Sequence, residues 1–290
     1  MKVCAVIVTY NRLSLLIGCI DSLRNQSYPL DSIIVVNNDS TDGTKEWLER
    51  QTDIIVINQS NIGGAGGFHT GTKYAYEKGY DWVWLMDDDV EPTPNCLENL
   101  FVYNSQDIGI IQPLRIFNGK PVLFESKELN LSDFSVDLHS AFVTLDDIST
   151  PCYVAAIPFE GPLVKREVFT KIGFPNKDYF IFYDDTDFSL RTQIAGYKIL
   201  LIPTAILQKK ILPSTEKVSL SWKKCYDIRN YAFFNRVYGH NWKVRYLRSL
   251  KSSYHYIRYC YRNNNDMSLS ISIKILKYTL KGMLKEMGKL

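Results

Sequence analysis

Three consecutive aspartates, Asp87, Asp88 and Asp89, follow residues 82–86, an apolar run typical of a buried strand. Adjacent carboxylates repel one another, and a bound divalent cation relieves that repulsion. Since alternate residues of an extended chain point the same way, Asp87 and Asp89 could bind one such cation together. The alternative interpretation is an acidic loop that caps the next helix, but the preceding strand favours the metal site.

A glycine-rich segment, residues 61–68, opens a predicted helix with the sequence Asn-Ile-Gly-Gly-Ala-Gly-Gly-Phe. Glycine lets a backbone approach a phosphate group closely, and the free N–H groups of a helix N-terminus bind anions. The segment has neither the GxGxxG spacing nor the GK[ST] ending of the known nucleotide-binding loops. It therefore predicts either a phosphate-binding turn or an ordinary turn, at Gly63, Gly64, Gly66 and Gly67.

A second group of acids, Asp184, Asp185 and Asp187, follows the aromatic residues 179–183. A carboxyl group beside an apolar wall has a raised pKa and can act as a general base toward a hydroxyl. Acids also stabilise the first turn of a helix. Both roles are compatible, since one acid can cap the helix while another takes a proton.

Alternating strands and helices must position these groups. Helical spacing of apolar residues predicts helices at 13–23, at 44–51 and from the glycine segment onward. The predicted buried strands are residues 3–8, 33–36, 54–57 and 82–86. This order is typical of a doubly wound α/β domain, in which ligands bind at the carboxyl ends of the strands. The polar clusters that follow each strand should therefore meet at one cleft.

The remaining segments have weaker patterns. Short apolar runs predict strands near 110–111, 121–124 and 141–145, and the chain is expected to be helical from residue 219 onward. The six cysteines show no CxxC or CxxH spacing, which argues against a zinc site or a disulfide framework and favours a reducing compartment. Neither a signal peptide nor a transmembrane helix is expected from the apolar runs.

Charge divides the chain into an acidic body and a basic tail. Residues 208–290 hold 18 Lys and Arg against 4 Asp and Glu, while residues 1–207 hold 16 against 27. In the last segment, from residue 268, Leu and Ile residues are interspersed with Lys residues, so that a helix there would have an apolar face and a basic face. Such a helix can lie on an anionic membrane surface. A helical hairpin packed on the body, or an interface with a second copy of the chain, is the alternative.

Four segments together resemble the inverting glycosyltransferases of family 2, which have the GT-A fold. They are residues 8–12 (Val-Thr-Tyr-Asn-Arg), 37–44 (Asn-Asn-Asp-Ser-Thr-Asp-Gly-Thr), 87–89 and 183–191 (Tyr-Asp-Asp-Thr-Asp-Phe-Ser-Leu-Arg), and the resemblance covers about residues 1–207. The glycine segment is similar to one in bacterial galactofuranosyltransferases. Tyr226, Arg229 and Asn230 resemble a Tyr-x-x-Arg-Asn element found in galactofuranosyl- and rhamnosyltransferases.

The resemblance implies roles for individual residues. Asp87 and Asp89 would bind Mn²⁺ or Mg²⁺, and Asp88 the sugar nucleotide. Asp185, with Asp184 as its neighbour, would deprotonate the acceptor hydroxyl for a single displacement that inverts the anomeric carbon. The nucleoside would contact Thr9, Tyr10, Arg12 and Asn38 or Asp39, and the backbone of Gly63, Gly64, Gly66 and Gly67 would lie near the diphosphate or the sugar.

The sequence departs from the family pattern at two positions. Family members commonly have Asp where this chain has Asn37, so the nucleoside contact could move to Asp39. Many also have a metal-binding His after the last catalytic strand, where this chain has Gln208 and Lys209. Gln208 could be the third metal ligand, or Lys209 could balance the diphosphate charge directly.

These observations predict a mixed α/β sheet flanked by helices, with a GT-A catalytic domain at 1–210 and a basic, aromatic-rich helical region at 211–290. The predicted reaction is transfer of galactofuranose from UDP-galactofuranose to a lipid-linked glycan or growing cell-surface polysaccharide, at the inner face of the cell membrane. A rhamnosyltransferase that uses dTDP-rhamnose is the alternative enzyme. An inactive scaffold of the same fold, or a nucleic-acid-binding protein, is the alternative of another class, although the acidic body disfavours nucleic acid.

Overall fold

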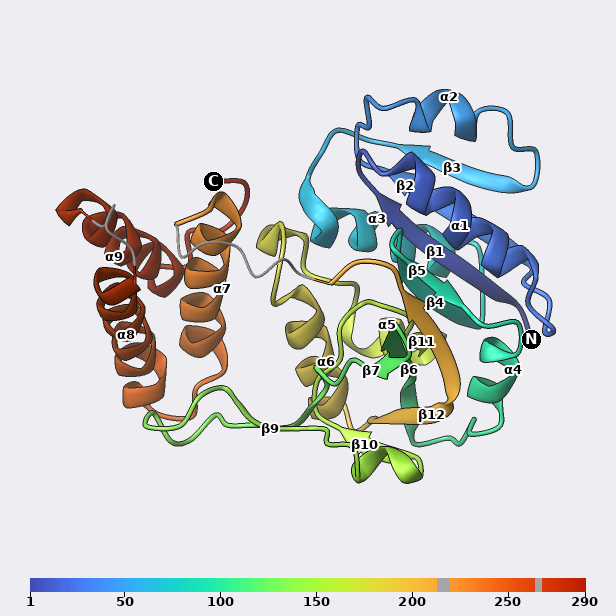
Figure 1. The fold of residues 1–290 in the computed structure, drawn as a ribbon. Coiled ribbons are helices and arrows are strands. Elements are labelled where there is room, and N and C mark those ends of the chain that lie inside the picture. The colour runs from blue at the N-terminus through green and yellow to red at the C-terminus, as the bar shows by residue number, and fades with distance from the viewer. Residues whose placement is uncertain (213–219, 264–267) are drawn as a thin grey trace.

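The protein is described by a computed structural model that covers residues 1–212, 220–263 and 268–290. The strands of its main sheet are β1 (Val3–Thr9), β2 (Ser32–Asn37), β3 (Ile54–Asn58), β4 (Trp82–Asp87), β5 (Val90–Pro92), β6 (Ile108–Phe117), β7 (Lys120–Pro121), β10 (Cys152–Val154), β11 (Leu163–Lys165) and β12 (Lys198–Lys209). Their order is β10-β12-β6-β11-β4-β1-β2-β3, with β5 beside β12 and β7 beside β6 (Figure 1). β4, β1, β2 and β3 are parallel, whereas β11 runs antiparallel to both β4 and β6. The sheet is therefore mixed, as expected.

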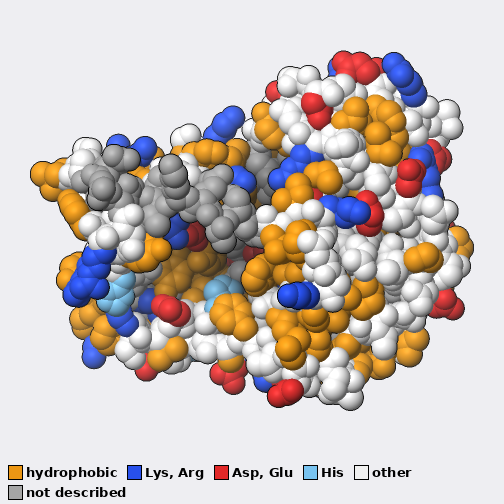
Figure 2. Space-filling model, viewed as in Figure 1, with side chains coloured by type: hydrophobic (Ala, Val, Ile, Leu, Met, Phe, Trp, Pro, Cys, Tyr) orange, Lys and Arg blue, Asp and Glu red, His pale blue; other side chains and the backbone are white. Residues whose placement is uncertain are grey.

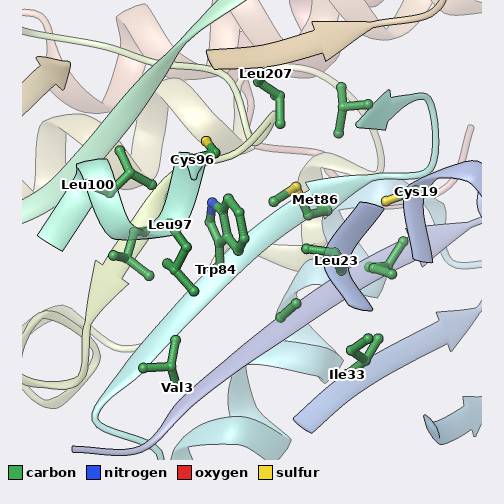
Figure 3. Close-up of a cluster of buried hydrophobic side chains, with 14 of the residues drawn as sticks. Val3, Cys19, Leu23, Ile33, Trp84, Met86, Cys96, Leu97, Leu100 and Leu207 are labelled. Carbon is green, nitrogen blue, oxygen red and sulfur yellow. The ribbon is translucent and has the colours of Figure 1, made fainter. Parts of the chain in front are cut away.

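Helices cover both faces of the sheet. This agrees with β1, which is apolar at every position before its last residue, Thr9. Its odd residues from Val3 to Ile7 pack with α1 (Leu13–Arg24), α2 (Thr44–Leu48) and α4 (Cys96–Phe101), and Figure 3 shows part of this cluster around Trp84. Its even residues from Cys4 to Val8 pack with α3 (Gly63–Glu77), α5 (Arg166–Ile172) and α6 (Asp184–Ile194). A continuous apolar strand is the pattern of a sheet buried on both sides.

The C-terminal region forms a group of helices beside the sheet domain (Figure 1). It contains α7 (Trp222–Tyr238), a short π-helix (Lys243–Leu247), α8 (Arg248–Asn263) and α9 (Leu269–Met283). α9 packs closely on α7 at Gly282, where an added Cβ atom would collide with the backbone carbonyl of Arg229. The absence of a side chain at Gly282 thus permits this approach. Among residues 1–212, 220–263 and 268–290, no helix has the length and apolar character needed to span a bilayer.

The predicted strands and helices of residues 1–100 are confirmed, with small differences in their ends. The helix expected at 44–51 ends at Leu48, and the glycine segment lies inside the first turns of α3. The strands expected near 121–124 and 141–145 were placed wrongly, since β7 has only two residues and β9 (His139–Phe142) pairs with β8 (Ser126–Leu129) in a small separate sheet. A strand pair outside the main core lacks the apolar periodicity that sequence analysis detects.

Candidate active site

A cavity of about 1330 Å³ lies between the carboxyl ends of β1 and β4, the first turns of α3 and α6, and the C-terminal helices α7 and α9. Figure 2 shows the surface hollowed between these helices and the rest of the molecule, with hydrophobic side chains gathered in the hollow. Most of the predicted site residues line this cavity, as expected for strand ends that meet at one edge of a sheet. They are Thr9, Tyr10, Arg12, Asn38, Gly63, Gly64, Asp87, Asp88, Asp184 and Asp185.

The aspartate cluster begins at the last residue of β4. Asp88 accepts hydrogen bonds from Thr9 Oγ1 at 2.8 Å and from the Arg12 guanidinium at 3.1 Å. Burial raises the pKa of Asp87 and of Asp89, and the nearby carboxylate of Glu160 raises both further. Asp89 Oδ1 is buried and has no hydrogen-bond partner among the described residues. A buried carboxylate oxygen without a donor is suited to a cation.

A chain of buried charges lies on the other side of Asp89. Lys209 Nζ is 3.7 Å from Asp89 Oδ2 and donates to Glu160 Oε1 at 2.8 Å. Glu160 Oε2 in turn accepts from Arg115 at 2.6 Å, and Arg115 also binds the fully buried Glu125. Sequence analysis singled out neither Arg115 nor Glu125, and the only signal at Glu160 is its position before Gly161.

Lys209, and not Gln208, is the side chain that β12 directs into the cavity. Lys209 lines the cavity, whereas Gln208 stands next to it on the strand, opposite Glu91 of β5, and does not line it. Neighbouring residues of a strand point to opposite faces, so only one of the two can reach the aspartates. Within the described ranges, no group of three or more His, Cys, Asp or Glu side chains is arranged to hold a metal ion. Asp87 and Asp88 line the cavity together with the ammonium group of Lys209, whereas Asp89 does not line it but lies 3.7 Å from that ammonium group.

A further side of the cavity is formed by the residues that follow β1 and β2. Tyr10 is half exposed there, and Asn38 donates to the carbonyl of Gly63 at 3.1 Å. Asn37 is buried and donates to Asn58 Oδ1 at 2.8 Å, so it joins the ends of β2 and β3. Asp39 is exposed, has a positive φ of 65° and does not line the cavity. The structure therefore does not bring Asp39 to the other residues of this group.

The four glycines of the segment 61–68 divide into two pairs. A Cβ atom at Gly67 would collide with Val8, and one at Gly66 with Ile62, so these two glycines allow close packing. Gly63 has a φ of +81° and lies against the carbonyl of Phe180, while a Cβ atom added at Gly64 would meet no other atom within 4 Å. Only Gly63 and Gly64 face the cavity. Their backbone is the part that a ligand can approach.

The second acidic group begins α6. Burial raises the pKa of Asp185 to about 6, with a further contribution from Glu160. Asp185 also accepts from the backbone N–H of Thr186 at 2.6 Å. Burial and the neighbouring Asp185 raise the pKa of Asp184. Asp187 points away from the cavity to Arg191 and Tyr238, at 2.7 and 2.6 Å. A partly buried carboxyl group with a pKa near neutrality, such as that of Asp185, can accept a proton from a hydroxyl.

Comparison with known families identifies the fold and the family. The family model described as Glycosyl transferase family 2 matches residues 4–154, and that described as Glycosyl transferase family group 2 matches residues 82–274. The chain belongs to glycosyltransferase family 2. Its mixed sheet flanked by helices is the GT-A fold of these glycosyltransferases.

Relatives of this family 2 chain include enzymes for two different sugars. Galactofuranosyltransferase GlfT1 of Mycobacterium tuberculosis (strain ATCC 25618 / H37Rv) is 40% identical over 212 residues, which cover 67% of this chain and 66% of the relative. The dTDP-rhamnosyl transferase RfbF of Shigella flexneri is 26% identical over 203 residues, covering 69% and 66%. GlfT1 of Mycolicibacterium smegmatis matches over 92 residues only, 30% of its length. The chain thus spans two thirds or less of these relatives.

Solved structures support the GT-A fold. The mannosyltransferase PcManGT from Pyrobaculum calidifontis, in complex with GDP-Man and Mn²⁺, has a TM-score of 0.58 and 14% identity, and the match covers 98% of this chain and 88% of that one. TarS of S. aureus has a TM-score of 0.60 and 14% identity, covering 98% and 49%. At this identity the likeness concerns the fold alone.

Proposed function

We propose that the protein is an inverting galactofuranosyltransferase that uses UDP-galactofuranose. The observation that carries the proposal is that Asp185 lines the same cavity as Asp87 and Asp88, with Asp89 next to them in the chain. A base for the acceptor and a group that binds a nucleotide diphosphate are the two parts that a single displacement needs. The sugar is supported by the 40% identity with GlfT1, which is higher than the 26% identity with RfbF. Transfer of rhamnose from dTDP-rhamnose is the second candidate.

Asp87 and Asp89 would hold Mn²⁺ or Mg²⁺. The unpartnered Asp89 Oδ1 and the raised pKa of both groups fit a cation there. Such an ion would supply positive charge that neutralises the diphosphate. Gln208, the third ligand suggested by sequence, has no place in this proposal because Lys209, its neighbour on β12, is the residue that approaches Asp89.

The chain's own residues would perform the remaining steps. Thr9 and Arg12 hold Asp88 in place, and Tyr10 and Asn38 lie where a nucleoside would enter. Lys209 would offset the negative charge that develops on the leaving diphosphate. Asp185 would take the proton of the acceptor hydroxyl as its oxygen attacks the anomeric carbon, so that configuration inverts in one step.

The acceptor is proposed to be a lipid-linked glycan or cell-wall polysaccharide at an anionic membrane. α9 exposes an apolar stripe, each member at least 41% exposed, formed by Leu269, Ile273, Leu276, Leu280 and Leu284. Lys277, Lys281 and Lys285 flank it, and Lys274 and Lys289 line the cavity. Apolar and basic faces side by side suit a helix that lies on an anionic leaflet. The proposed location is therefore the inner face of the cell membrane.

Calorimetric titration with UDP, dTDP and GDP, each in Mn²⁺ and in EDTA, tests the donor. Tight binding of UDP that requires the metal supports the proposal, and preference for dTDP supports the rhamnosyltransferase. Transfer from UDP-galactofuranose is then measured with lipid-linked acceptors. Binding of no nucleotide would contradict both enzymes and favour an inactive scaffold.

A further inference from the structure

The segment that leads into the second acidic group has an unusual backbone. Phe180, Phe182 and Tyr183 have φ values of 67°, 65° and 69°, in the left-handed region that bulky side chains avoid. Asp184 and Asp185 follow immediately. Three unfavourable conformations within four residues do not persist unless surrounding contacts impose them. The cause must lie outside the segment.

α7 supplies those contacts through two fully buried side chains. Asn230 Nδ2 donates to the carbonyls of Tyr179, Ile181 and Phe182, at 3.1, 2.7 and 3.0 Å. Arg229 donates to the carbonyl of Tyr179 at 3.0 Å. Both side chains are 0% exposed, and Arg229 also donates to the carbonyl of Gly288. The backbone that precedes the acids thus satisfies the NH2 group of Asn230, while Asn230 Oδ1 accepts from Arg229 Nε at 2.9 Å.

The same segment also touches the donor side of the cavity. The carbonyl of Phe180 accepts from the N–H of Ala65 at 3.2 Å, in the first turn of α3. The Phe180 ring stacks on Tyr226 of α7, with ring centroids 4.8 Å apart and planes 17° apart. Residues 179–183 thus connect α7 to both α3 and α6.

We propose that Arg229 and Asn230 are positioning residues, which hold the segment 179–183 with its three left-handed residues in place and thereby direct Asp184 and Asp185 into the cavity. The inference rests on the proposed role of Asp185 as the base. It makes α7 part of the catalytic unit rather than of a separate appendage. It also assigns a role to the Tyr-x-x-Arg-Asn element, in which Tyr226 packs on the segment that the other two residues hold.

Asn230→Ala tests the proposal, with Asn235→Ala as its matched control. Asn235 is also fully buried on α7, but its amide donates to Tyr231 and Ser249 and does not touch the segment. Misplacing a reacting group by about 1 Å can cost on the order of 100-fold in rate. We expect Asn230→Ala to lower kcat by at least about tenfold with UDP affinity unchanged, and Asn235→Ala to leave kcat within about twofold of wild type. Equal losses of kcat in both variants would overturn the proposal.

Hydrogen exchange tests the same proposal without enzymatic activity. The backbone amides of residues 179–185 should exchange faster in Asn230→Ala than in wild type or Asn235→Ala, at a temperature where all three are folded. Unchanged exchange there would also overturn it. Absence of transfer by the wild-type protein would contradict the proposed function alone, because the exchange measurement would still decide whether α7 holds the segment.

Discussion

At the scale of single residues, the surroundings of Asp185 determine the pH range in which its carboxylate can act as a base. Its pKa is raised to about 6, so the group binds a proton below that pH and is an ionised base above it. Transfer should therefore decrease as the pH falls through about 6. The pH dependence of kcat, measured with saturating donor and acceptor, should show an acidic limb in that range. A constant kcat from pH 5 to 8 would exclude Asp185 as the base.

Asp185→Asn removes the base but keeps the size of the side chain. We expect transfer to fall by on the order of 100-fold or more, since general bases contribute about 10²–10⁴-fold. UDP affinity should be unchanged, because the proposed donor contacts lie on β1, α3 and β4. Calorimetry and a transfer assay on the same preparation separate the two effects. Full activity of the variant would contradict the assignment.

Lys209 and Lys210 are adjacent and differ in what surrounds them. Lys209 is buried against Glu160 and Asp89, whereas Lys210 pairs with Glu91 at the surface. Lys209→Met leaves buried carboxylates without their cation and should destabilise the fold by about 3 kcal/mol. Lys210→Met should cost less than about 1 kcal/mol. Chemical denaturation of both variants measures the difference, and equal losses would contradict the buried network.

At the scale of elements, the first turn of α3 contains one glycine that close packing requires and one whose backbone is open to a ligand. Gly63 cannot accept a Cβ atom because of its positive φ and the carbonyl of Phe180, so Gly63→Ala should destabilise the protein by about 2 kcal/mol. Gly64 has open space around it. Gly64→Ala should leave the melting temperature unchanged and weaken UDP binding if the donor lies on this backbone. Unchanged UDP affinity in Gly64→Ala would place the diphosphate elsewhere.

An irregularity in β12 explains why the sequence left both Gln208 and Lys209 as candidates for the cavity. The pairing of β12 with β6 is irregular between Ile202 and Ile206, where three residues have no partner on β6. Such an irregularity resets the alternation of side chains along the rest of the strand. It therefore decides that Lys209 faces the cavity and Gln208 does not.

At the scale of the whole molecule, the exposed stripe of α9 should determine membrane binding. Each basic residue near an anionic leaflet contributes about 1 kcal/mol, and the apolar side chains add to this. A variant with Ile273→Ser and Leu280→Ser should sediment less with phosphatidylglycerol vesicles than wild type does. Leu145→Ser, which changes an exposed leucine of the sheet domain, is the control. Binding should also weaken in high salt.

A second copy of the chain is the competing occupant of the stripe. Light scattering of the same proteins without lipid distinguishes the two. A dimer that becomes a monomer in the Ile273 and Leu280 variant, with no vesicle binding by either protein, would contradict the membrane proposal and assign the stripe to an interface.

The sequence by itself determined the α/β architecture and the two acidic groups that meet in the cavity. Apolar periodicity is local, and a polar cluster that follows a buried strand, as Asp87–Asp89 does, must lie at the carboxyl end of the sheet. Only the tertiary structure decided the partners of those groups. Arg115 reaches Glu125 and Glu160, Asn37 reaches Asn58, and Asn230 holds the segment before Asp184. Such contacts depend on strand register and on loop conformation, which are set by packing between segments far apart in the chain.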